Sequence, residues 1–407
     1  MNKRKVPKIR FKGFYDDWEQ RKFSDLVLIE RGGSPRPIDA FITDNPNGLN
    51  WVKIGDAPEQ GRYITKTAEK IRPEGLSKTR EVHPGDLILS NSMSFGKPYI
   101  MGVDGCIHDG WLLIRDTQKR FDLKFLCHML GTDQMLNQYR AFAAGSTVNN
   151  LNKELVGNTT VTIPSLEEQQ VLGQYFENLD HLITLHQRKL EKLKIIKKSM
   201  LENCFPKNGA KVPKTRFSEF SDDWEQRKLG DIYVERNERG NTELDILSVS
   251  IHHGISKNEL GTDELGKSVR RSDDKSLYKH VYYGDLVFNM MRAWQGAIGV
   301  ARNEGMVSPA YISAIPNGSI FPEYMDYCLC RKCIINQINN LSYGVTDFRK
   351  RLYWEPFTRV TIMMPSVDEQ RKITDVLSRL DHLITLHQSK LEKLKMIKKS
   401  MLETMFV

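Results

Sequence analysis

The chain has 407 residues, of which 40% are hydrophobic and 27% charged, and a formal net charge of +9 at pH 7. This composition excludes a disordered chain, and the length predicts two or three domains. The positive charge is compatible with a polyanion partner but does not identify one. No stretch approaches the roughly 18 consecutive apolar residues of a membrane span, and MNKRKVPKIR at the start lacks the apolar core of a signal peptide, so we expect a cytoplasmic protein.

Two similar segments mark the start of each half of the chain. Residues 7–26 (PKIRFKGFYDDWEQRKFSDL) align with residues 213–232 (PKTRFSEFSDDWEQRKLGDI), and both contain an unbroken Asp-Asp-Trp-Glu-Gln-Arg-Lys. Self-similarity of this kind indicates a duplicated architecture. We therefore expect two halves with the same fold.

After these segments, each half continues with less similar sequence that still shares a skeleton. A Gly-Asp pair, at 85–86 or 284–285, precedes an apolar run typical of a strand, and a second short strand is expected at 111–114 or 310–315. An apolar helix is expected next, at 121–139 or 321–338, followed by a short strand that leads into a long helix. This pattern predicts two mixed α/β domains.

Glycine-rich loops in the divergent regions carry side chains of the types that contact DNA. Arginine, lysine, asparagine and glutamine hydrogen-bond base edges or phosphates, and glycine permits close backbone approach. Each residue alone is equally well explained as solvated surface, but such residues recur in both halves. The candidate DNA-binding residues are Arg31, Gly33, Arg36, Asn91 and Lys97 in the first half, and Arg270, Arg271, Arg292, Trp294 and Gln295 in the second.

A long helix is predicted at the end of each half, because residues 180–202 and 381–403 are nearly identical and strongly periodic. A Pro-Ser-x-x-Glu sequence before each run predicts a capping box at the helix start. Apolar positions then step by four and three, which is the spacing of a coiled-coil seam, and its two histidines are expected to form a packed, hydrogen-bonded layer. The predicted helix-pairing residues are Leu179, Ile183, His186, Leu190 and Leu193 in the first copy, and Leu380, Ile384, His387, Leu391 and Leu394 in the second.

The sequence offers little for catalysis. Gly261–Ser268 matches the phosphate-loop pattern GxxxxGK[ST], but its flanks are polar and two acidic residues lie within it, so a solvated loop is the better interpretation. The (Asp/Asn)-Pro-Pro-aromatic loop of an amino-methyltransferase is missing, and the Cys330–Cys333 CxxC lacks a second cysteine or histidine pair at zinc spacing. We therefore expect neither a catalytic residue nor a metal site.

The order of the elements predicts the architecture. Two similar mixed α/β domains, at 1–163 and 207–364, alternate with two long helices, at 164–206 and 365–407. A chain that runs out along one helix and returns along its equivalent predicts an antiparallel coiled coil and a pseudo-twofold relation between the domains.

The sequence resembles the specificity subunit of type I restriction-modification systems. The resemblance rests on the duplicated Asp-Asp-Trp-Glu-Gln-Arg-Lys segments, the capped helices, and short motifs such as Pro-Ser-x-x-Glu-Gln and Arg-Ala-Trp-Gln-Gly. The resemblance implies that each domain is a target recognition domain that reads one half of a bipartite site in double-stranded DNA. It also implies that the helices act as a spacer and dock two modification (methyltransferase) subunits, which restriction subunits join. Catalysis, S-adenosylmethionine, ATP and magnesium would then belong to those partners, and this chain would have no cofactor of its own.

Two alternatives stay open at this point. The chain could be a cytosolic enzyme that binds a nucleotide at residues 261–268, or a structural coiled-coil scaffold. ATP binding by the isolated chain would favour the first, and an assembled complex that selects no DNA sequence would favour the second.

Overall fold

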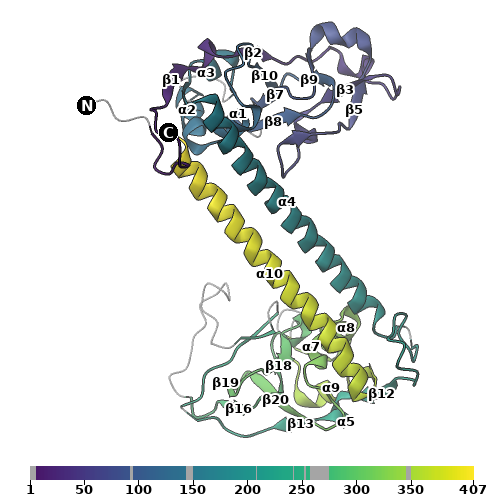
Figure 1. The fold of residues 1–407 in the computed structure, drawn as a ribbon. Helices are drawn as coiled ribbons and strands as arrows, with labels where there is room; N and C mark the ends of the chain where they lie inside the picture. The colour runs from purple at the N-terminus through teal and green to yellow at the C-terminus, as the bar shows by residue number, and fades with distance from the viewer. Residues whose placement is uncertain are drawn as a thin grey trace. The chain divides into compact units, whose positions relative to one another are not determined.

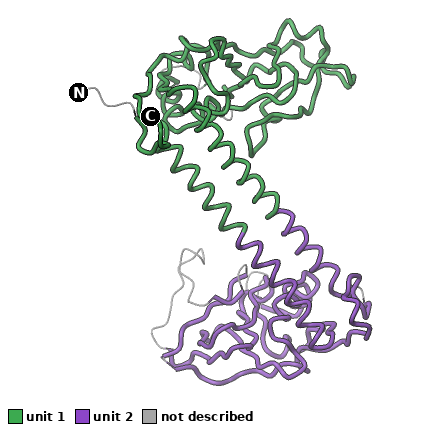
Figure 2. The backbone as a smooth tube through the Cα atoms, viewed as in Figure 1, with its two compact units in different colours: residues 1–190, 387–407 green, residues 191–386 purple. Residues whose placement is uncertain are grey.

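The computed structural model describes residues 6–91, 95–143, 150–207, 209–241, 243–251, 254–256, 275–344 and 350–407. It divides into two compact units, the first formed by residues 1–190 with 387–407 and the second by residues 191–386 (Figure 2). Each unit combines a mixed α/β domain with parts of two long helices, α4 (Leu166–Asn203) and α10 (Val367–Met405) (Figure 1). The expected fold class is confirmed. Each long helix is divided between the two units, and the four segments expected from the sequence stay a prediction.

The first unit contains two sheets and a separate strand pair. Its central sheet has the order β2-β10-β7-β8-β4, its second sheet the order β5-β3-β9-β6, and β1 pairs with β11. The strands are β1 (Glu19–Lys22), β2 (Leu28–Arg31), β3 (Leu49–Val52), β4 (Tyr63–Ile64), β5 (Glu69–Ile71), β6 (Arg80–Val82), β7 (Leu87–Ser90), β8 (Pro98–Met101), β9 (Gly105–Ile107), β10 (Trp111–Arg115) and β11 (Thr160–Ile163). The helices are η1 (Phe23–Asp25), η2 (Ile38–Ala40), η3 (Ile54–Asp56), η4 (Pro73–Lys78), α1 (Leu123–Leu130), α2 (Asp133–Ala143) and α3 (Lys153–Gly157).

The central sheet of the first unit is buried on both faces. Leu87 and Leu89 of β7 pack into the core that contains α1, whereas Ile88 between them packs into a second core with Trp111. Successive side chains of a strand point to opposite faces, so a strand covered on both sides needs a continuous apolar run. This explains why the strand after the Gly-Asp pair reads Leu-Ile-Leu without alternation.

The second unit repeats this arrangement with a four-stranded central sheet in the order β13-β20-β17-β18. The strands are β12 (Glu225–Lys228), β13 (Tyr233–Arg236), β14 (Val249–Ser250), β15 (Gly254–Ile255), β16 (Lys279–Val281), β17 (Leu286–Asn289), β18 (Ile298–Val300), β19 (Gly305–Val307), β20 (Tyr311–Pro316) and β21 (Thr361–Met364). The helices are α5 (Leu229–Ile232), η5 (Ala293–Gln295), α7 (Tyr324–Leu329), α8 (Lys332–Leu341) and α9 (Trp354–Thr358). In both units the duplicated Glu-Gln-Arg-Lys forms a strand that pairs with the strand entering the long helix.

The single apolar helix expected in each middle is instead two helices. In the first unit, α1 ends at Gly131, whose amide donates to the main chain of α1, and the Thr132 hydroxyl accepts a hydrogen bond from the amide of Met135 in α2. In the second unit, α7 and α8 are likewise separated, around Cys330 and Arg331. A cap residue between two apolar segments ends one helix and starts the next, which a periodicity count does not detect.

Each long helix begins at the predicted Pro-Ser-x-x-Glu-Gln sequence. The amide of Glu168 donates to Ser165 Oγ at 3.4 Å, as a capping serine requires. The Glu168 carboxylate, however, accepts hydrogen bonds from Arg10 Nε and Nη2, each at 2.7 Å, instead of completing the capping box at the serine amide. Gln169 bonds the main chain of Arg120, Asp122 and Pro164. The sequence motif therefore caps the helix and also ties it to the domain.

The second unit forms the same contacts. Ser366 caps α10 through the amide of Glu369, and the Glu369 carboxylate binds Arg216 Nε and Nη2, each at 2.8 Å. Gln370 bonds the main chain of Ser319, Phe321 and Pro365.

Within each unit the two long helices pair antiparallel. In the first unit, Asp180 of α4 binds Lys398 of α10, and His186 Nδ1 lies 2.8 Å from His387 Nδ1. In the second unit, Lys197 of α4 binds Asp381 of α10. Of the predicted seam residues, Leu179, Ile183, Leu190, Leu193, His387 and Leu391 are buried, and His186, Leu380, Ile384 and Leu394 are half-buried. No helix in the described part of the chain is long and apolar enough to span a membrane.

Candidate nucleic-acid interface

The candidate residues of the first unit lie together at one end of the central sheet. Strand β10 pairs with β2 and with β7, so that Leu112 lies opposite Arg31 and Trp111 lies opposite Ser90. Asn91 directly follows β7, and the amide of Lys97, just before β8, donates to Ser90 Oγ at 2.9 Å. Arg31, Gly33, Arg36, Asn91 and Lys97 therefore come from three separate segments that meet at this edge.

Two glycines hold the arginine-bearing segment against the turn between β9 and β10. Gly32 donates to the Trp111 carbonyl at 2.9 Å, and Gly33 donates to the Ile107 carbonyl at 3.2 Å. A Cβ atom on Gly32 would lie 2.2 Å from the His108 carbonyl oxygen, and one on Gly33 would lie 2.3 Å from the Lys78 carbonyl oxygen. The sequence suggested that glycine here permits close approach to DNA. The close approach in the structure is to the chain's own backbone, which fixes the position of Arg31 and Arg36.

At the centre of this edge lies Asp109, which does not belong to any of the sequence motifs. Its main-chain oxygen accepts hydrogen bonds from Asn91 Nδ2 at 2.8 Å and from Arg31 Nε at 3.3 Å. Its carboxylate accepts from Ser34 Oγ at 3.0 Å and lies 3.9 Å from Arg36 Nη2. The only sequence signal for it is a charged residue in the short turn before the apolar strand β10.

Two of the candidates project outward from this edge. The side chain of Arg36 is 83% exposed, and Lys97 is also exposed, with its Nζ 5.1 Å from the centre of the Tyr99 ring. Lys97 also lines a cavity of about 410 Å³ together with Phe95, Gly96 and Arg62. Asn91, in contrast, is buried. Arg36 and Lys97 can therefore reach a bound polyanion directly, whereas Asn91 supports the turn.

In the second unit, the candidates Arg292, Trp294 and Gln295 lie on the turn that follows β17. This turn contains η5 and ends at Gly296, whose φ is +103°. Arg292 and Gln295 are exposed, while Trp294 is half-buried and donates from Nε1 to the Met291 carbonyl at 3.0 Å. Arg270, Arg271 and the phosphate-loop-like sequence 261–268 lie outside the described residues.

Asn91, which directly follows β7, and Met290, which follows the last residue of β17, occupy equivalent main-chain positions. Asn91 donates to the Gly110 carbonyl at 2.9 Å and accepts from the Leu151 amide at 3.0 Å. Met290 donates to the Ala310 carbonyl at 3.0 Å and accepts from the Leu352 amide at 2.8 Å. The same main-chain frame thus presents different side chains in the two units.

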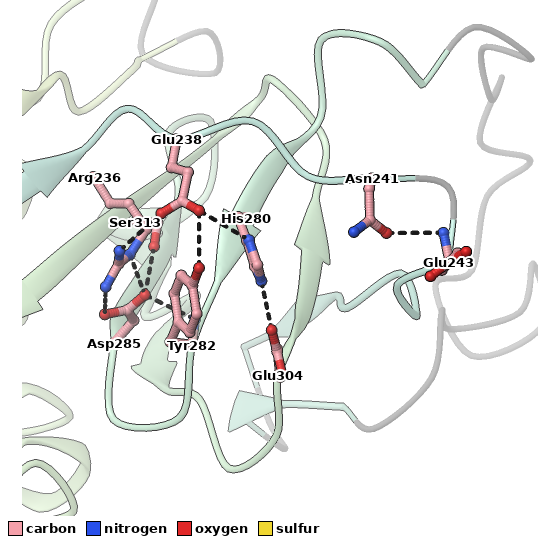
Figure 3. A network of polar contacts seen from close by, with 9 residues as sticks. All are labelled: Arg236, Glu238, Asn241, Glu243, His280, Tyr282, Asp285, Glu304 and Ser313. Carbon is pink, nitrogen blue, oxygen red and sulfur yellow. Dashed lines mark hydrogen bonds and ion pairs between the residues drawn. The ribbon is translucent and has the colours of Figure 1, made fainter.

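The opposite end of β17 carries a network that holds the sheet together (Figure 3). Asp285, from the duplicated Gly-Asp turn, accepts from Arg236 Nε at 2.7 Å and from the Tyr282 amide at 2.9 Å. Glu238 accepts from the Tyr282 hydroxyl at 2.8 Å, which lowers the pKa of Glu238, and lies 3.3 Å from His280. Because this network lies at the far end of the strand from η5, we assign it to the framework and not to the interface.

The first unit braces its Gly-Asp turn in the same way. Asp86 accepts from Arg115 Nη2 at 2.9 Å and from the His83 amide at 2.9 Å. The hydrogen bond to Asp86 raises the pKa of Arg115, and that to Asp285 raises the pKa of Arg236, so both guanidinium groups stay charged. The Gly-Asp pair is therefore a structural feature shared by both sheets.

The chemistry of the two turns suits binding rather than catalysis. Arginine, lysine and glutamine side chains supply hydrogen-bond donors for phosphates and for the major-groove edges of bases. Among the described residues, no group of three or more histidine, cysteine, aspartate or glutamate side chains is arranged to hold a metal ion.

Comparison with known proteins gives a consistent result. The family model for the type I restriction modification DNA specificity domain matches residues 15–195 and 221–396. The MjaVIII type I restriction enzyme specificity subunit of Methanocaldococcus jannaschii is 21% identical over 95% of this chain and 91% of its own length. A protein described as the MjaX specificity subunit of the same organism is 22% identical over 95% of this chain and 92% of its own length. The crystal structure of a type I S subunit from M. genitalium has a similar fold, with a TM-score of 0.61 at 14% identity over 99% of each chain.

Proposed function

Since this chain belongs to the type I restriction-modification DNA specificity family, as a non-catalytic specificity subunit with two domains, we propose that each domain reads one half of a bipartite site in double-stranded DNA. One observation carries the proposal: equivalent main-chain positions follow β7 and β17, and exposed donors lie at the same edge of each sheet, with Arg36 and Lys97 in one unit and Arg292 and Gln295 in the other. A constant frame with different side chains is what two readers of different sequences require.

Exchange of one domain tests this function. Replacing residues 23–160 with the first variable region of another family member should change one half of the recognised sequence and leave the other half unchanged. The measurement is genome-wide mapping of methylated adenines in cells that also contain the modification and restriction subunits. A replacement that altered both halves together would contradict independent reading.

The same mapping also tests the scaffold alternative. A complex that methylates without any sequence preference would support a scaffold role.

We further propose that the long helices dock two modification subunits, which the restriction subunits then join. Support comes from apolar side chains that the helix pair leaves exposed. In the first unit Leu182, Leu185 and Ile397 are 40%, 52% and 44% exposed. The second unit has their repeat equivalents, with Ile196, Leu383 and Leu386 each 38% exposed. Because Asp180 binds Lys398, antiparallel pairing puts Leu182 and Ile397 at matching levels on one flank, and an apolar stripe of this kind is typical of a protein interface.

Substitution of that flank tests the docking proposal. Leu182→Glu with Ile397→Glu should abolish binding of the modification subunit in a pull-down of the purified proteins. The matched control is Val234→Glu, because Val234 is 67% exposed but lies on β13 away from the helices. Equal binding by both variants would show that the flank is not the docking surface.

A further inference from the structure

The structure points to a role for Asp109 that the sequence did not suggest. We propose that Asp109 is a positioning residue that sets base preference in the first half-site by orienting Arg36. This inference rests on the proposed reading of DNA by the first unit.

The carboxylate of Asp109 is held in one orientation by two neighbours. Ser34 Oγ donates to Oδ1 at 3.0 Å, and His108 Nε2 lies 3.0 Å from the same oxygen. The amide of Gly110 donates to His108 Nδ1 at 2.9 Å, which leaves Nε2 as the ring nitrogen that faces Asp109. Ser34 and His108 both contact Oδ1, and Oδ2 is the oxygen that faces Arg36.

Arg36 is paired with this oxygen but is not locked by it. The distance from Arg36 Nη2 to Asp109 Oδ2 is 3.9 Å, which is an ion pair without a hydrogen bond, and the arginine side chain is 83% exposed. A guanidinium has five N–H donors, so pairing on one side leaves two donors for the O6 and N7 acceptors of a guanine. The carboxylate also repels phosphate, which biases Arg36 toward a base edge and away from the DNA backbone.

Side-chain substitution at Asp109 separates this role from that of its main chain. Arg31 and Asn91 bind the main-chain oxygen of Asp109, which every variant keeps. Ser34, His108 and Arg36 contact the carboxylate. A change of the carboxylate should therefore affect the base position read by Arg36 and spare the one read by Arg31.

The second unit provides an internal reference. Ala310 corresponds to Gly110, because it accepts the equivalent main-chain hydrogen bond. The counterpart of Asp109 is therefore Pro309. Proline has no carboxylate to orient an arginine. The second half-site should consequently be insensitive to any change at Asp109.

The test compares Asp109→Asn, Arg36→Ala and the double variant in the assembled complex with modification subunits. Asparagine keeps an acceptor oxygen for Ser34 and His108 but loses the charge that attracts Arg36. Each single variant should relax the same one base position in the first half-site, on the order of 10- to 100-fold in relative methylation rate. The double variant should relax it no further than Arg36→Ala alone, because Asp109 acts through Arg36.

Three results would overturn the inference. Asp109→Asn could relax a different position from Arg36→Ala, could reduce selectivity further in the Arg36→Ala background, or could leave the preference unchanged. Asp39→Asn, which changes an exposed carboxylate in η2, is the matched control for loss of one negative charge. Failure of the underlying function looks different, because the wild-type complex would then show no base preference in the first half-site at all.

Discussion

The ion pair between Arg10 and Glu168 should be one of the strongest single determinants of how the first domain holds its long helix. The Glu168 side chain is 1% exposed and that of Arg10 is 15% exposed, and two hydrogen bonds of 2.7 Å join them. Removing one partner of a buried pair strands the other charge and costs about 3–5 kcal/mol. Because Arg10 retains some contact with water, we expect Glu168→Leu to cost near the lower limit, about 3 kcal/mol.

The double variant distinguishes a stranded charge from lost packing. Arg10→Met with Glu168→Leu replaces both charges with apolar groups of similar size, a change that is often close to neutral. It should cost only about 0.3–1 kcal/mol, the value of a carboxylate near the positive end of a helix dipole. The double variant should thus be more stable than Glu168→Leu alone, although simple addition of the two single-substitution effects would make it less stable.

Hydrogen exchange resolved along the chain is the suitable assay, because a protein with two units need not unfold in one step. Glu168→Leu should accelerate exchange in β1 and in the first turns of α4. The Arg216–Glu369 pair of the second unit is the built-in reference, with two hydrogen bonds of 2.8 Å and a 1% exposed glutamate. Exchange that is no faster in Glu168→Leu than in the double variant would refute the reasoning.

Three further predictions concern the helix pair and the interface. Leu190→Asp should lower stability by several kcal/mol in a thermal melt because it places a charge in the buried seam, whereas Leu185→Asp on the exposed flank should change it by less than about 0.5 kcal/mol. Burial, with Lys189 nearby, lowers the pKa of His387, so the unfolded chain binds more protons than the folded chain. The contribution of His387 to the free energy of unfolding should therefore be complete above about pH 6.5 and decrease as the pH drops. The decrease should be smaller in His387→Gln. Gly33→Ala should weaken methylation at the first half-site only, since its Cβ would meet Lys78 at 2.3 Å, whereas Gly55→Ala, with no atom within 4 Å, should have no effect.

The features that the sequence predicted well are those encoded by neighbouring residues. The duplication, the start of each long helix and the seam all depend on spacings of a few residues, and α4 and α10 begin where the Pro-Ser-x-x-Glu sequences place them. The break between α1 and α2 was missed for the same reason, because apolar periodicity continues across Gly131 and hides the cap at Thr132.

The features that the sequence did not reveal depend on residues far apart in the chain. Ser34 and Asp109 are 75 positions apart, and Arg10 and Glu168 are 158 apart. A single sequence carries no signal for such pairs. The local sequence therefore predicts a capping box for Glu168, and it does not single out Asp109. The sequence predicts that Gly33 lets the backbone approach DNA, and it carries no signal for the close approach that the structure shows, which is to the main chain of Lys78.

The duplicated helices also show how one scaffold carries two different domains. The same helix-borne pair occurs in both units, as Asp180 with Lys398 and as Asp381 with Lys197. In the first unit Asp180 also accepts from Arg62 Nε at 3.3 Å, whereas in the second Asp381 accepts from the Tyr327 hydroxyl at 2.9 Å.

Each aspartate thus has a lysine partner from the duplicated helices and another partner, Arg62 or Tyr327, from the divergent domain. Burial, with Asp381 nearby, raises the pKa of Tyr327, so its phenol remains a hydrogen-bond donor, and Arg62 is a donor at any physiological pH. A carboxylate can accept a hydrogen bond from a guanidinium or from a hydroxyl, so at this position the duplicated helices require only a half-buried donor from the domain. Because the donor at this position differs between the units, the two domains can diverge there while the helix pair stays the same, as the proposed independent reading of the two half-sites requires.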